Sequence, residues 1–236
     1  MTFVPLFVAL WKGCTTRARF ISFTVVGAVG IAVAALLRGT YSFDEVERAA
    51  GFVDWFGLSL VAPVAALVFG TASLGDPIED GTYVYLWLRP IGRWQITMAA
   101  FAATASVVVP FSVVPTVIGA ALLSSDAAVI IGAVVATTLA AVAYSAVFVL
   151  IGQVTQRALV WGAVYLLIFE QFIARGGSGL GFFSVHSHTV SILAKTVDRE
   201  INLDYFSRPV AVVMSLLIPA LILAWSVQRQ NRMDVA

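Results

Sequence analysis

The chain has 236 residues, of which 60% are hydrophobic and 11% are charged, and its formal net charge is +1. An average soluble domain carries about 25% charged residues, and a soluble fold of this length cannot bury so large an apolar excess. The near-neutral charge, without a basic cluster, argues against a nucleic-acid partner. The single cysteine, Cys14, excludes a disulfide framework and a paired-cysteine zinc site. We therefore expect an all-α integral membrane protein.

Residues 1–19 precede the first apolar stretch and predict an amphipathic helix in the membrane interface. The apolar side chains at helical spacing are Phe3, Leu6, Phe7, Leu10, Trp11 and Cys14. Lys12, Arg17 and Arg19 lie off this stripe or close its end, where cations meet anionic headgroups. Such a helix either anchors the chain before its first span or helps to seat a cytoplasmic partner.

Six stretches are apolar enough and long enough to cross the bilayer, which takes about 20 residues per helix. They cover residues 20–37, 55–74, 94–123, 127–151, 158–174 and 209–227. The third is long enough to tilt, or to bend at Pro110 and Pro115. No small-residue cleavage site follows the first stretch, so we expect a retained helix rather than a signal peptide. The prediction is one transmembrane domain, residues 1–236, built as a six-helix bundle.

Six spans place both termini on the same side of the membrane. Lys and Arg are slightly more frequent in the segments on that side, eight against six on the other. Because cytoplasmic segments near span ends carry the excess of cations, we expect both termini in the cytoplasm and the protein in the cell membrane.

The segment between the second and third spans is the most informative part of the sequence. It opens with Asp76-Pro77, a helix-start signal, and ends with the basic run 89–93, Arg-Pro-Ile-Gly-Arg. An acidic start and a basic end suit the helix dipole. The pattern predicts a short aromatic helix along the cytoplasmic face.

This segment resembles the loop after the second span in permease subunits of type-2 ATP-binding-cassette (ABC) exporters. Those subunits carry an acidic residue, then Gly-Thr, then a Pro-Ile-x-Arg-like ending before a long third span. In that family the loop forms a coupling helix that docks into a separate nucleotide-binding subunit. The resemblance implies that the residues at this contact are Asp76, Glu79, Asp80, Gly81, Thr82, Arg89 and Arg93.

The same resemblance implies partners and excludes catalysis in this chain. Two copies of a cytoplasmic ATPase would bind ATP and Mg²⁺, and a second permease subunit, identical or homologous, would complete the transporter among membrane lipids. The chain needs such a partner because neither of its lysines, Lys12 and Lys195, follows a glycine as a P-loop lysine does. We therefore expect no enzyme activity and no cofactor here. The substrate is open: a hydrophobic drug, a lipid or a peptide.

Glu170 is the only formally charged residue well inside a predicted span, and Gln171 follows it. A charge inside the membrane costs about 2.5–3.5 kcal/mol on insertion scales, so it must be paired, protonated or exposed to water. One interpretation is a structural pair with Arg175 or with a hydroxyl group on a neighbouring helix. The other places Glu170 and Gln171 on a translocation route. The alternative function is then a proton-coupled secondary transporter or channel, and a scaffold for another membrane complex is a third.

Two further patterns lie beyond the fifth span. His186 and His188 suggest a polar outer loop rather than a metal site, since no further Cys or His is present to complete one. Residues 176–179, Gly-Gly-Ser-Gly, resemble the Gly-x-Ser-Gly of rhomboid intramembrane proteases. Serine needs a base, which rhomboids take from a later span, and residues 209–227 contain no histidine. Proteolysis is therefore a remote alternative.

Overall fold

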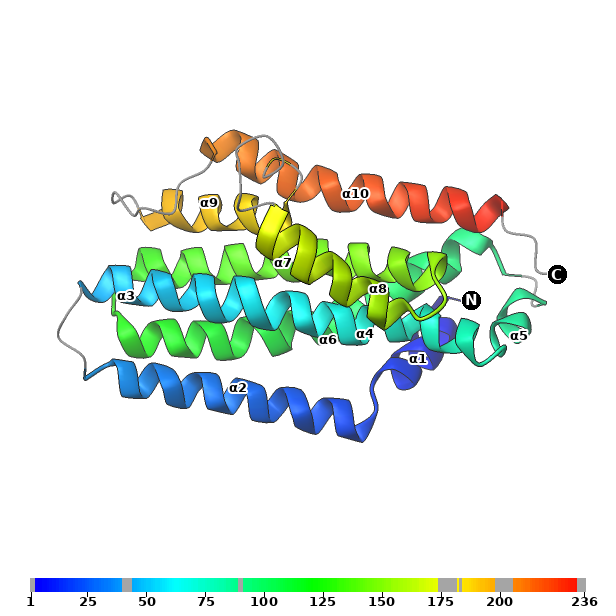
Figure 1. The fold of residues 1–236 in the computed structure, drawn as a ribbon, viewed down its shortest axis with the longest axis horizontal. Helices are drawn as coiled ribbons and strands as arrows, with labels where there is room; N and C mark the ends of the chain where they lie inside the picture. The colour runs from blue at the N-terminus through cyan, green and yellow to red at the C-terminus, as the bar shows by residue number, and fades with distance from the viewer. Residues whose placement is uncertain are drawn as a thin grey trace.

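The computed structural model describes residues 3–39, 44–88, 91–173, 182, 184–197 and 206–232. All regular elements in these ranges are helices (Figure 1), which confirms the all-α prediction. The elements are α1 (Phe3–Cys14), α2 (Arg17–Leu37), α3 (Glu45–Phe52), η1 (Val53–Val61), α4 (Ala62–Glu79), α5 (Tyr83–Trp87), α6 (Arg93–Leu123), α7 (Ala127–Val154), α8 (Ala158–Val164), η2 (Tyr165–Ile173), α9 (Val185–Val197) and α10 (Arg208–Arg232). The segments η1 and η2 are π-helical.

Five helices in the described part of the chain are long and apolar enough to cross a membrane. They cover Arg17–Leu37, Glu45–Glu79, Arg93–Leu123, Ala127–Val154 and Arg208–Asn231. The second of them joins α3, η1 and α4 into one helical run, so it is longer than the predicted span 55–74. In the third, α6 continues through both Pro110 and Pro115. These are the features of a helical membrane protein.

The predicted span 158–174 is the exception, and six spans are not confirmed. Its described part consists of α8 and η2, which together rise only about 24 Å at 1.5 Å per residue, less than the ~30 Å hydrocarbon core. Helix α8 packs near the end of α7, where a Cβ at Gly162 would lie 3.2 Å from Phe148. Helix α9 packs near the start of α7, where a Cβ at Gly132 would lie 3.1 Å from Leu193. Two short helices thus cover the two halves of α7.

The centre of the bundle is formed by α4, α6 and α7, and the outer positions by α2 and α10. In the spanning windows of Glu45–Glu79 and Ala127–Val154, 67% of residues are buried, against 22% in α2 and in α10. Figure 1 shows α2 along one flank of the bundle and α10 along the opposite flank. The large apolar side chains exposed on α2 and α10 therefore suit contact with lipid or with another apolar surface.

Helix α1, helix α5 and the last turns of α10 lie at the same end of the bundle, opposite α3 (Figure 1). Part of the apolar stripe of α1 is covered by protein: Leu6, Leu10 and Cys14 are buried, and the two leucines belong to a cluster that includes Ile96 of α6. Trp11, on the same stripe, is 39% exposed. The first helix is therefore docked on the bundle rather than free in the interface.

Candidate functional site

The segment that connects α4 to α6 differs from its prediction in where the acidic residues lie. Helix α4 continues through Pro77 to Glu79, so Asp76 and Glu79 end the spanning helix instead of opening the short one. A proline this close to the end of a helix removes a single backbone hydrogen bond, and the Asp80 N–H still donates to the Asp76 carbonyl at 2.9 Å. Gly81, with φ of +69°, then turns the chain, and α5 follows.

Asp76 ties the end of α4 to the start of α2. Its carboxylate lies 2.9 Å from the Arg19 guanidinium, and both side chains are partly exposed, at 48% and 25%. Arg19 also donates to the carbonyl of Cys14 at 3.2 Å, so one cation holds the junction of α1 and α2 against α4. An ion pair this exposed stabilises the fold by about 1 kcal/mol or less.

Glu79 and Thr82 have structural partners of their own. The Glu79 carboxylate accepts a hydrogen bond from the backbone N–H of Ala158 at 3.2 Å, at the first residue of α8. The Thr82 hydroxyl donates to the Pro77 carbonyl at 3.3 Å. Asp80 is exposed and lines, with Asp76 and Thr82, a hollow of about 320 Å³ between α1, α4 and α5.

The basic end of the segment is described in part. Arg93, the first residue of α6, donates to the backbone carbonyl of Asn231 at 2.9 Å and so ties α6 to the last turns of α10. Arg89 lies outside the described residues. The structure therefore gathers the acidic residues and Arg93 at one end of the bundle, and each of Asp76, Glu79 and Arg93 contacts a different helix.

A buried polar network links α5 to three long helices, and the sequence did not reveal it. Gln153 of α7 donates to the Thr97 hydroxyl at 2.9 Å and to the Gln230 side-chain carbonyl at 2.5 Å, and it accepts from the Ser226 hydroxyl. Gln230 in turn donates to the Tyr83 hydroxyl. All five side chains are at most 5% exposed. Leaving a buried polar group without a hydrogen bond costs free energy, so this network holds α5 against α6, α7 and α10.

Tyr83 is the residue through which α5 enters this network. Burial raises its pKa to about 12, despite the opposing effect of the Arg93 cation, so the phenol is protonated at physiological pH. On the outer side of α5, Tyr85 is 71% exposed, and just beyond its last residue Leu88 is 74% exposed. The short helix is thus anchored on one side and apolar and open on the other.

Glu170 of η2 is buried, with 3% exposure, and accepts three hydrogen bonds. The donors are the Tyr165 hydroxyl at 3.2 Å, the Ser184 hydroxyl at 2.6 Å and the backbone N–H of Val185 at 3.2 Å. Val185 is the first residue of α9, so the carboxylate lies at the positive end of that helix. Hydroxyl partners were one of the two expected alternatives for Glu170. The side chain of Gln171 and residue Arg175 lie outside what the structure describes.

The two histidines are in helix α9 and buried, which corrects the prediction of a polar outer loop. His186 uses one ring nitrogen, Nε2, for both Asp54 at 2.8 Å and Ser59 at 2.9 Å. A Ser-His-Asp triad requires two different ring nitrogens for these roles, so the cluster is not arranged as one. His188 Nε2 bonds the Phe182 carbonyl at 2.8 Å. Within the described ranges, no three His, Cys, Asp or Glu side chains gather to hold a metal; residues 176–179 fall outside those ranges.

No family model matches the chain, and no curated protein matches it. The class that its fold defines is a helical membrane protein.

Proposed function

We propose that the chain is the permease subunit of an ATP-driven ABC exporter of the type-2 kind. The single observation that carries this proposal is the two-sided character of α5. Its inner side is hydrogen-bonded through Tyr83 to a buried network on three long helices, and its outer side exposes Tyr85 and, beyond its end, Leu88. A helix of this kind suits docking of a second protein whose movement must reach the bundle.

On this account the outer side of α5 is where a cytoplasmic ATPase docks. Exposed apolar side chains with a polar rim mark protein contacts. The rim consists of Asp80, Gly81 and Thr82, all exposed. Of the other residues proposed for the contact, Asp76, Glu79 and Arg93 position the segment through their own hydrogen bonds, and Arg89 is proposed from the sequence pattern alone.

The proposed cycle is mechanical. Two ATPase subunits, which bind ATP and Mg²⁺, close on nucleotide and shift the α5 helices of two permease subunits, identical or homologous. The buried network passes that shift to α6, α7 and α10, and the bundles then move as rigid bodies to open a route between them. This chain forms and breaks no covalent bond. The α5 end of the bundle faces the cytoplasm, with both termini on that side of the membrane, and the substrate is a hydrophobic drug, a lipid or a peptide.

Site-specific photo-crosslinking in the native host tests the proposal. A photoreactive amino acid at Tyr85 should crosslink to a soluble protein with a P-loop, identified by mass spectrometry. The same group at Trp55, which is 58% exposed at the opposite end of the bundle, is the matched control and should not. Crosslinks from Tyr85 to lipid alone, or to an ATPase equally from both positions, would contradict the assignment of this surface.

A further inference from the structure

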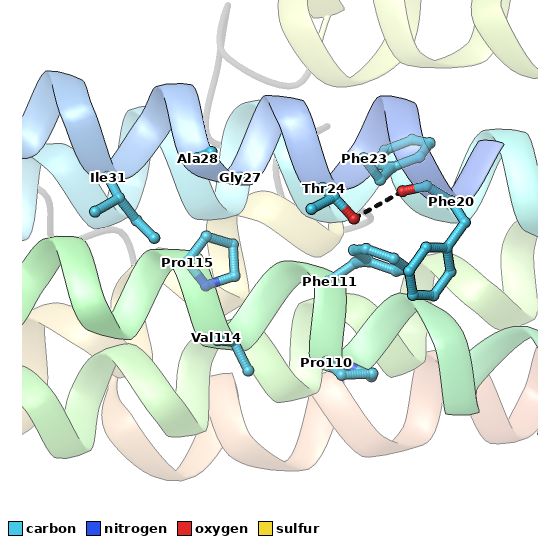
Figure 2. Close-up of a pocket in the computed structure, with 10 residues that line it drawn as sticks. All are labelled: Phe20, Phe23, Thr24, Gly27, Ala28, Ile31, Pro110, Phe111, Val114 and Pro115. Carbon is cyan, nitrogen blue, oxygen red and sulfur yellow. Dashed lines mark hydrogen bonds between the residues drawn. The ribbon is translucent and has the colours of Figure 1, made fainter. Parts of the chain in front are cut away.

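A hollow of about 450 Å³ opens between α2 and α6 on the outside of the bundle (Figure 2). Figure 2 shows the rings of Phe20, Phe23 and Phe111 gathered at one end of it and Pro115 toward the other. The one hydroxyl that lines it, that of Thr24, donates its proton to the Phe20 carbonyl at 2.9 Å, so the lining has no unused side-chain hydrogen-bond donor. The lining is therefore suited to hydrocarbon.

The length of this groove matches one lipid chain. On α2 it extends from Phe20 to Ile31, which is about 16 Å at 1.5 Å per residue. That is roughly half of the ~30 Å hydrocarbon core, the depth of one leaflet. Gly27 packs against Pro115, where a Cβ would lie only 3.3 Å from the proline ring, so the two helices approach each other closely along this side of the groove.

The end of the groove nearest α1 opens beside two cations. A second hollow, of about 290 Å³, shares Phe20 with the first and is lined by Lys12, Thr15, Thr16 and Arg17. Lys12 and Arg17 are exposed, and neither has an ion-pair partner among the residues that the structure describes. The third cation of this region, Arg19, is occupied by Asp76. Two available cations at the start of a spanning helix attract anionic headgroups.

We propose that this surface binds one anionic phospholipid, with its phosphate between Lys12 and Arg17 and one acyl chain in the groove between α2 and α6. Lys12 and Arg17 favour a lipid over a second copy of the chain. The phosphate of a lipid neutralises these two cations, whereas an apolar contact between subunits does not. The site goes beyond the exporter proposal and does not depend on an ATPase, so either proposal can fail without the other.

Native mass spectrometry of the purified full-length chain in a neutral detergent tests the site. Phosphatidylglycerol and phosphatidylcholine with the same acyl chains are the probes, and we expect one phosphatidylglycerol to be retained in preference. Lys12→Gln with Arg17→Gln should weaken its binding about 25-fold, because each cation near an anionic lipid contributes a factor of roughly five. Arg38→Gln, at the other end of α2, is the charge control and should change nothing.

Ala28→Phe should fill the groove and abolish retention of the lipid. Val29→Phe, at the neighbouring position on the opposite, exposed face of α2, is its matched control and should leave retention intact. Unchanged phosphatidylglycerol binding in the double charge variant would overturn the proposal, as would displacement of the lipid by millimolar inorganic phosphate. If Ala28→Phe instead dissociates a dimer and leaves lipid binding unchanged, the groove is a subunit contact and the proposal is wrong.

Discussion

Tyr83 and Gln230 are 147 positions apart in the sequence, yet the Gln230 side-chain amide donates a hydrogen bond to the Tyr83 hydroxyl in the interior of the bundle. The bond joins the five-residue helix α5 to the last spanning helix. Because Gln230 also bonds Gln153 of α7, a displacement of α5 cannot leave α7 and α10 in place without breaking buried hydrogen bonds.

Tyr83→Phe should destabilise the protein by about 1–3 kcal/mol, because the Gln230 amide is left buried without that acceptor. Tyr85→Phe removes the same hydroxyl from an exposed ring on the same helix and should change stability by less than about 0.5 kcal/mol. Denaturant unfolding in detergent, followed by tryptophan fluorescence, measures both. Equal effects of the two substitutions would show that the hydrogen bond between Gln230 and Tyr83 contributes nothing to the free energy of unfolding.

Gln153→Leu should be more costly, about 2–4 kcal/mol, since it leaves Thr97, Ser226 and Gln230 without their shared partner. Gln228→Leu is the matched control: the same change on an exposed turn of α10, one turn or less from the network. Thermal unfolding measures the pair. A Gln153 variant as stable as the control would mean that the network is not closed in the folded protein.

Asp80→Lys should uncouple ATP hydrolysis from transport and leave the bundle folded, because Asp80 is exposed on the proposed docking surface. Glu79→Lys should uncouple too but also lower stability, since the Glu79 carboxylate holds the first N–H of α8. Glu47→Lys, exposed near the opposite end, is the control. Transport and ATPase rates in vesicles that contain the whole complex measure coupling, and unchanged coupling in the Asp80 variant counts against the assignment of this surface.

Glu170→Gln should destabilise the start of α9 by about 1–2 kcal/mol, because an amide lacks the charge and half of the acceptor capacity of the carboxylate. Hydrogen exchange of the α9 amides measures the local effect, with Glu45→Gln on the exposed start of α3 as control. The pH dependence of transport should not change. Its loss in the Glu170 variant alone would favour the proton-coupled alternative over the exporter.

Cys14 should react slowly with maleimide in the folded protein. It is fully buried, and burial raises the pKa of the thiol to about 11, so the reactive thiolate is scarce at pH 8. The double variant Gly13→Cys with Cys14→Ser moves the thiol by one residue, to the exposed side of α1, and should speed the reaction about tenfold or more. Equal rates would show that α1 is not docked on the bundle.

Continuous apolar runs predicted the five long apolar helices, because in a bilayer a helix satisfies the backbone hydrogen bonds of such a run internally. The same reasoning predicted a further span at residues 158–174, of which the described part, α8 and η2, is shorter than the hydrocarbon core. Composition does not distinguish a full span from a shorter apolar run. The feature that sets this segment apart is Glu170, whose three hydrogen-bond donors include the backbone of α9.

The residues of the candidate site were also predictable from the sequence only in part. The acidic and basic residues of the segment 76–93 stood out because charges are rare in this chain. Gln153, Ser226 and Gln230 did not, since polar residues near helix ends are ordinary at a membrane surface and only the packing of α7 against α10 makes them partners. The burial of His186 could not be predicted from its neighbours in the sequence, because its partner, Asp54, lies 132 positions away.

The most direct test of the central claim is to purify the tagged chain from its native host in mild detergent and identify the proteins that accompany it. The exporter account predicts a soluble ATPase with a P-loop, in a ratio of one to each copy of this chain, lost in the Tyr85→Asp variant. A preparation that contains no ATPase, even after crosslinking before lysis, would contradict it.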